Sequence, residues 1–129
     1  MTPPLQAAVW IDHHEARIFH VEADRFDESV LNAPRAHIHR HPKGATEEHH
    51  HPDDVHHFFD AVAKALHEVD EILVLGPSTA KLQFIRHLHG HAPALEKKVV
   101  GLETVDHPTD RQIVAYAKRY FGVPLASGR

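Results

Sequence analysis

Histidine offers the most obvious chemistry in this chain, because 16 of its 129 residues are histidine and none is cysteine. Imidazole binds Zn²⁺, Ni²⁺ and Cu²⁺, and it titrates near neutral pH. The run His37-x-His39-x-His41 places three imidazoles at alternate positions. Such residues share a face on a strand, so His37, His39 and His41 are candidate ligands of a zinc or nickel ion. A solvent-facing strand whose polar positions are histidine explains the same spacing without a metal, and we favour that interpretation.

A second histidine set, His87, His89 and His91, follows a segment with helical periodicity. Only His87 and His91 share a face there, since residues four apart are neighbours on a helix. Gly90 lies between them and predicts the end of the helix, which makes this pair the weaker metal site.

Three carboxylates adjoin predicted elements: Asp12 ends the first apolar run, Asp106 follows the last strand, and Asp110 opens the last helix. Carboxylates that cluster can hold Mg²⁺ for phosphodiester cleavage. No acidic residue follows the strand that ends at Gly76, and turn and capping roles suit Asp106 and Asp110. A metal-dependent nuclease is therefore a third hypothesis, and the sequence favours no catalytic role.

An anion could dock where a strand runs into a helix at Ser78 and Thr79, with Lys81 adding a positive charge. No phosphate-loop pattern accompanies these residues, and a plain helix cap by Ser78 is the simpler interpretation.

Four basic residues are candidates for RNA binding. Arg17, Arg35, Arg40 and Lys43 could line one stripe that binds phosphates. Acidic residues lie just beyond this stripe, so a mixed solvated face is an equal alternative.

The elements that must position these residues follow the order β-β-β-α-β-α-β-α. Strands are predicted at 7–12, 16–22, 28–41 (interrupted at 32–34), 71–76 and 98–105, and helices begin after Asp53, Ser78 and Thr109. The first three strands form an antiparallel meander, and the later strands need right-handed parallel crossovers. The simplest closure is an α/β, ribonuclease-H-like five-stranded mixed sheet, with the first strand central and helices on both faces.

Length and composition fit one globular domain over residues 1–129. Hydrophobic residues make up 42% and charged residues 25% of the chain, and the formal net charge is −4. We expect a core over about 7–121, an exposed His-rich loop at 42–52 and short flexible termini. Without cysteine, disulfides and thiol catalysis are excluded. With no signal peptide or membrane span evident, a cytoplasmic protein is expected.

Three segments carry a family resemblance: Ala8-Val-Trp-Ile-Asp-His-His-Glu-Ala-Arg-Ile-Phe, Ile72-Leu-Val-Leu-Gly-Pro-Ser-Thr-Ala-Lys and Val99-Val-Gly-Leu-Glu-Thr-Val-Asp. Together they resemble the central domain of archaeal and eukaryotic peptide-chain release factors. They are also similar to Pelota-type ribosome-rescue factors and to small bacterial relatives described as translational machinery proteins. The resemblance implies a ribonuclease-H-like fold and an ancestry in ribosome or tRNA binding.

One departure from that family affects the expected function. In release factors, the loop between the third strand and the first long helix carries Gly-Gly-Gln. The matching loop, residues 42–52, holds the single glycine Gly44 and no glutamine. We therefore expect a non-catalytic, translation-associated accessory protein that binds the ribosome, tRNA or another RNA. The alternative is a His-rich divalent-metal-binding protein without a further cofactor, and an exposed edge strand of the meander could pair two copies.

Overall fold

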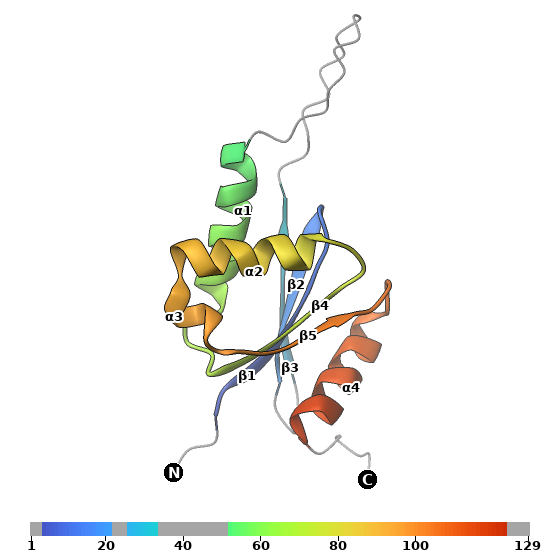
Figure 1. The fold of residues 1–129 in the computed structure, drawn as a ribbon. Helices are drawn as coiled ribbons and strands as arrows, with labels where there is room; N and C mark the ends of the chain where they lie inside the picture. The colour runs from blue at the N-terminus through green and yellow to red at the C-terminus, as the bar shows by residue number, and fades with distance from the viewer. Residues whose placement is uncertain (1–3, 22–25, 34–51, 124–129) are drawn as a thin grey trace, which may run out of the picture.

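The computed structural model describes residues 4–21, 26–33 and 52–123, and its elements follow the predicted order with one short helix added (Figure 1). They are β1 (Gln6–Ile11), β2 (Glu15–Val21), β3 (Phe26–Asn32), α1 (Pro52–Ala65), β4 (Glu71–Gly76), α2 (Ala80–His91), α3 (Pro93–Glu96), β5 (Val99–Thr104) and α4 (Asp110–Phe121).

The five strands form one mixed sheet in the order β3-β2-β1-β4-β5. β1 pairs antiparallel with β2, and β2 pairs antiparallel with β3. β4 runs parallel to both β1 and β5. The predicted ribonuclease-H-like arrangement with a central first strand is therefore confirmed. β3 is an edge strand, as expected for the meander, and its pairing with a second copy stays a prediction.

Helices cover both faces of the sheet, because the central strands are apolar on both sides. In β1, Val9 and Ile11 join the core beneath α1 and α2, whereas Ala8 and Trp10 join the core beneath α4. Figure 1 shows α1 and α2 on one face and α4 on the other. In the described part of the chain, none of the helices combines the length and apolar character that a bilayer span requires.

The carboxyl ends of β1 and β4 approach each other closely at Gly76. A Cβ atom on Gly76 would lie 2.3 Å from the carbonyl oxygen of Ile11, so only glycine fits without moving the backbone. The amide of Val105, just after β5, donates to the carbonyl of Gly76. The segments that follow the three parallel strands therefore leave the sheet at one edge.

The predicted start of α4 is confirmed. The Thr109 hydroxyl accepts from the amide of Gln112, and the Gln112 side chain accepts from the amide of Thr109, which together make a capping box. The helix ends at Gly122, whose φ of 72° suits glycine.

The predicted bounds of α2 are wrong at both ends. The N-cap residue is Thr79 rather than Ser78, and no side chain caps the helix there. Gly90 does not end the helix, because the turn continues through it to His91 and closes with a bond from the Ala92 amide to the Leu88 carbonyl.

Three other elements differ from expectation. α1 begins at Pro52, so Asp53 lies within the helix and not before its first residue, where we predicted it. β3 begins at Phe26 rather than at Glu28, and its expected course to His41 lies outside the described residues. The four-residue helix α3 was not predicted. A single turn that starts at Pro93 is too short to show a helical period.

Candidate metal centre

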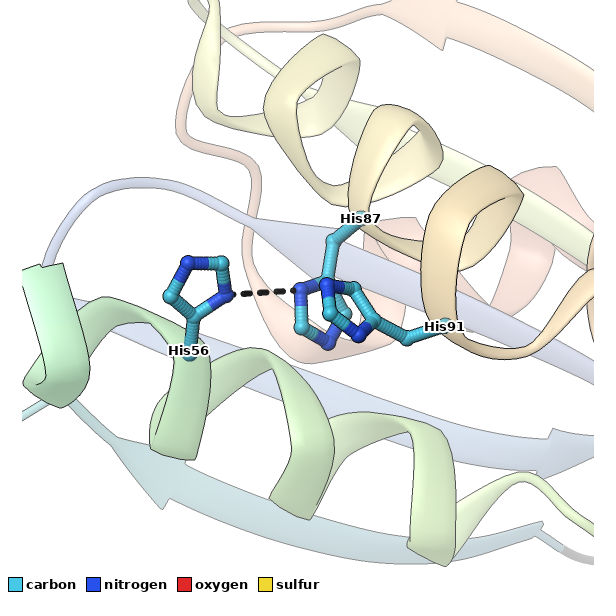
Figure 2. Close-up of side chains that lie close together, drawn as sticks. All are labelled: His56, His87 and His91. Carbon is cyan, nitrogen blue, oxygen red and sulfur yellow. Dashed lines mark hydrogen bonds between the residues drawn. The ribbon is translucent and has the colours of Figure 1, made fainter.

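Three histidines from two helices meet on the face covered by α1 and α2. His56 lies on α1, and His87 and His91 lie on α2 (Figure 2). Each offers one ring nitrogen, and these nitrogens all lie within 4.8 Å of one another. Over residues 4–21, 26–33 and 52–123, no other group of three or more histidine, aspartate or glutamate side chains meets so closely.

Aromatic packing between the two helices places His87. The ring of Phe59 on α1 lies 5.6 Å from that of Phe84 on α2, and it lies 5.4 Å from the ring of His87. His91 follows His87 by four residues, so its ring projects from the same face of α2. The apolar contact that joins the helices thus also brings two imidazoles towards α1.

The rings differ in exposure and contact. His87 is 7% exposed, whereas His56 and His91 are exposed at the surface. The Nδ1 atoms of His56 and His87 lie 3.3 Å apart, which is the dashed line in Figure 2. The His91 ring stacks on that of His87, with centroids 4.4 Å apart and planes 25° apart. The site therefore has one buried member and two members that solvent can reach.

Asp60 on α1 is a hydrogen-bond partner of His87. Its Oδ1 atom lies 2.8 Å from His87 Nε2. An ionised carboxylate only accepts hydrogen bonds, so we assign the proton of the neutral imidazole to Nε2. This hydrogen bond also lowers the pKa of Asp60. The Nδ1 atom of His87 then carries the lone pair that is directed at Nδ1 of His56, 3.3 Å away.

The three histidines line an open groove of about 260 Å³ between α1 and α2. Gln83 and Arg86 of α2 form part of the same wall. Solvent and a small ligand can thus reach the rings of His56 and His91, which lie beside the buried His87.

The structure brings together a different histidine set from the one that we predicted as metal ligands. His37, His39 and His41 lie outside the described residues and stay predicted ligands. His87 and His91 share a helix face as predicted, although Gly90 made them the weaker candidate site. His56 was missed, although His56-x-x-x-Asp60 and His87-x-x-x-His91 both have the spacing that aligns two side chains on one helix face.

Asp12 and Asp106 have structural partners. Asp12 Oδ1 accepts from the amides of His14 and Glu15, in the turn between β1 and β2. Its other oxygen lies 3.8 Å from Nε2 of His107. Asp106 is exposed, and its backbone carbonyl accepts from the Trp10 indole. Neither is in a carboxylate cluster among the described residues, and the nuclease hypothesis stays a prediction without further support.

Asp110 belongs with Arg17 rather than with the other two aspartates. Arg17 Nη1 lies 2.6 Å from Asp110 Oδ1, and Arg17 Nε lies 3.0 Å from Glu15 Oε2. Glu28 is 4.0 Å from the same guanidinium. The hydrogen bonds to Glu15 and Asp110 raise the pKa of Arg17, and burial raises that of Glu28. Three carboxylates thus offset the charge that Arg17 would offer a phosphate.

The remaining basic candidates divide into two groups. Arg35, Arg40 and Lys43 lie outside the described residues, so their role in RNA binding stays a prediction. Lys81 is buried at 6% exposure, and its Nζ donates to the Ser78 carbonyl at 2.6 Å. Its ammonium is therefore engaged by the turn before α2, while Ser78 and Thr79 are exposed and remain candidate anion contacts.

No protein-family model matches the chain, and no curated protein sequence matches it significantly. Solved structures do resemble it. Pelota from Archaeoglobus fulgidus has a TM-score of 0.64 at 19% identity, covering 92% of this chain and 32% of Pelota. Pelota from Thermoplasma acidophilum has a TM-score of 0.60 at 20% identity, and the match covers 94% of this chain and 35% of that Pelota. The archaeal translation termination factor aRF1 has a TM-score of 0.58 at 16% identity, and the match covers 87% of this chain and 32% of aRF1.

These similarities establish the fold. The chain spans about a third of the length of the proteins that it resembles, which corresponds to one of their domains. The likeness to release factors and Pelota proposed from the three sequence segments is therefore confirmed at the level of structure.

Proposed function

We propose that this chain is a non-catalytic, translation-associated accessory protein of the cytoplasm that binds the ribosome, tRNA or another RNA. The observation that carries this proposal is the structural likeness to Pelota and to an archaeal translation termination factor, which extends over about nine-tenths of the chain. The fold supplies a scaffold for such binding, and the basic residues named below would supply the contacts.

Peptide release is not part of the proposal. The segment that matches the Gly-Gly-Gln loop of release factors has one glycine and no glutamine. Binding without hydrolysis is therefore the expected activity.

The surface proposed for binding is the basic group of Arg35, Arg40 and Lys43. Arg17 contributes less, because Glu15, Glu28 and Asp110 surround its guanidinium. Phosphate contacts depend on uncompensated positive charge and weaken as salt rises. Binding should thus be salt-sensitive and should depend on these three residues.

Co-sedimentation with ribosomes and an RNA mobility-shift titration, each at low and moderate salt, test the proposal. We expect binding by the unchanged chain and a clear loss when Arg35, Arg40 and Lys43 are all replaced by alanine. The slope of log K against log salt should become shallower by about 0.7–0.9 for each phosphate that the variant no longer neutralises. The control replaces three exposed arginines, Arg86, Arg111 and Arg119, which removes the same charge elsewhere.

Two results would contradict the proposal. One is the absence of both ribosome and RNA binding at low salt. The other is equal weakening by the two triple variants, which would show that net charge alone governs the association.

Divalent-metal binding is a second candidate function. It is favoured by a specific observation, the three histidines that meet between α1 and α2. It does not compete with RNA binding, since the two proposals use different residues.

A further inference from the structure

The positions of His56, His87 and His91 match the needs of a first-row transition-metal ion. We propose that these three side chains bind one such ion, with Zn²⁺ as the first expected occupant, and that Asp60 orients His87 towards it. The site differs in every ligand from the one predicted at His37, His39 and His41.

The first support is the distance between two ligand atoms. Zinc–nitrogen bonds are about 2.0–2.1 Å long, so two nitrogens on neighbouring corners of a tetrahedron lie roughly 3.3 Å apart. The Nδ1 atoms of His56 and His87 are 3.3 Å apart. The spacing of these two nitrogens thus already suits two corners of a tetrahedral site.

The third corner requires a small movement of an exposed side chain. His91 now stacks on His87, and its ligand nitrogen lies within 4.8 Å of the other two. Rotation about the side-chain torsions of His91 would unstack the ring and direct a nitrogen to the ion. No backbone change is needed, because His87 and His91 lie on the same face of one continuous helix.

The fourth corner faces the groove between the helices. A site with three protein ligands and an open position holds water or a small ligand there. The groove of about 260 Å³ leaves room for either. An ion at this site would therefore be exchangeable rather than sealed in the core.

Asp60 supplies the support that metal-binding histidines usually have. A ligating imidazole generally donates its other N–H to a carboxylate or carbonyl, which fixes its tautomer and orientation. His87 Nε2 has this partner in Asp60 at 2.8 Å. The lone pair that Asp60 leaves on Nδ1 is the one directed at His56.

The donor set also selects the type of metal. Three neutral imidazoles suit Zn²⁺, Cu²⁺ and Ni²⁺, whereas Mg²⁺ and Ca²⁺ need oxygen ligands. Arg86 in the same groove further disfavours ions held mainly by charge. We expect no competition by Mg²⁺ or Ca²⁺.

The experiment must separate this site from the other histidines. Tag-free full-length protein would be titrated with Zn²⁺ by calorimetry, and with Co²⁺ by visible absorption, which reports coordination geometry. The same titrations would use a full-length variant in which His37, His39, His41, His49, His50 and His51 are replaced by glutamine. We expect that variant to keep one site, with Co²⁺ bands of a four- or five-coordinate ion.

Matched substitutions within this variant identify the ligands. His56→Ala and His91→Ala each remove an exposed ligand, so they leave the core intact. We expect each to weaken Zn²⁺ binding by about 100-fold or more, and Asp60→Asn to weaken it by about 10-fold. The controls, His57→Ala and His89→Ala, remove an exposed histidine from the same two helices outside the group and should leave affinity unchanged.

Three results would overturn the proposal. They are the absence of Zn²⁺ binding in the glutamine variant, unchanged binding after His56→Ala or His91→Ala, and an equal loss in the two control variants. None of them depends on ribosome or RNA binding, so this proposal and the proposed function can fail separately.

Discussion

His87 is the residue on which the candidate site depends, because it is the one buried histidine in the described part of the chain. A buried imidazole needs hydrogen-bond partners for both ring nitrogens. It has Asp60 on one side and His56 on the other. Among the described residues, no buried side-chain nitrogen or oxygen lacks a partner. Burial and partners, rather than the number of histidines, thus distinguish this one from the rest.

Tyr116 allows a pH-dependent contribution to stability to be measured. Its hydroxyl donates to the Glu103 carboxylate between α4 and β5, and this bond raises the pKa of Tyr116. A raised folded-state pKa gives stability that is complete below the unfolded pKa of about 10 and is lost as pH rises through the folded value. Tyr116→Phe should therefore lower the free energy of unfolding by about 1 kcal/mol at neutral pH.

Denaturant unfolding of the unchanged chain and of Tyr116→Phe, from about pH 7 to about pH 11, checks this prediction. The difference between their free energies of unfolding should become smaller above about pH 10. Tyr120→Phe is the control, since its hydroxyl donates to the backbone carbonyl of Val100 instead of to a carboxylate. A difference in free energy that stays constant from about pH 7 to about pH 11 would show that the hydrogen bond from Tyr116 to Glu103 is not its cause.

At the residue scale, the sequence allowed part of the site to be predicted. His87 and His91 are four residues apart, and that spacing was readable as one helix face. His56 lies 31 positions before His87. Its contact depends on how Phe59 packs against Phe84, which no local pattern encodes.

α2 carries two of the three proposed ligands, and Gly90 lies between them in the last turn of the helix. Glycine in a helix interior costs about 1 kcal/mol relative to alanine. A Cβ atom at Gly90 would have no atom within 4 Å, so alanine fits there without a clash. Gly90→Ala should raise the free energy of unfolding by about 0.5–1 kcal/mol, as measured by thermal or denaturant unfolding.

Gly122→Ala is a suitable comparison, because that position also has open space but has a φ of 72°. Alanine is strained there, so this substitution should destabilise the protein. Destabilisation by Gly90→Ala would show that α2 is not a regular helix at its end.

Elements with strong patterns were predicted well. β4 has the predicted bounds, since a short apolar run between polar residues is typical of a buried strand. The capping box of α4 was also readable from Thr109 and Gln112. The end of α2 was not, because glycine signals a helix end only when the chain turns there, and here the backbone stays helical through Gly90 to His91.

At the scale of the whole molecule, a metal that joins α1 to α2 should stabilise the entire fold. Ligand that binds the native state alone, at 100 times its Kd, adds about 2.7 kcal/mol. For a chain of this length that corresponds to a rise in Tm of roughly 10 °C. Differential scanning calorimetry with and without Zn²⁺ would check it in the variant that lacks the six histidines at 37–51.

His89→Ala should keep this rise and His91→Ala should lose it. A rise that survives in both would place the ion elsewhere, and no rise in either would contradict preferential binding of the ion to the folded chain.

The topology of the whole chain was predictable because few connections are allowed. An antiparallel start followed by right-handed parallel crossovers leaves the observed strand order as the simplest solution. The partner of the molecule was not predictable in the same way, since a fold of this type sets a scaffold and not a ligand.

The sheet separates two sets of polar contacts. The histidine group lies on the side of α1 and α2, whereas Arg17 and its carboxylates lie with Asp110 on the side of α4. The buried apolar strands β1 and β4 lie between these two sets of contacts. We therefore expect that metal binding at the histidine group would leave the ion pairs of Arg17 on the other face of the sheet in place.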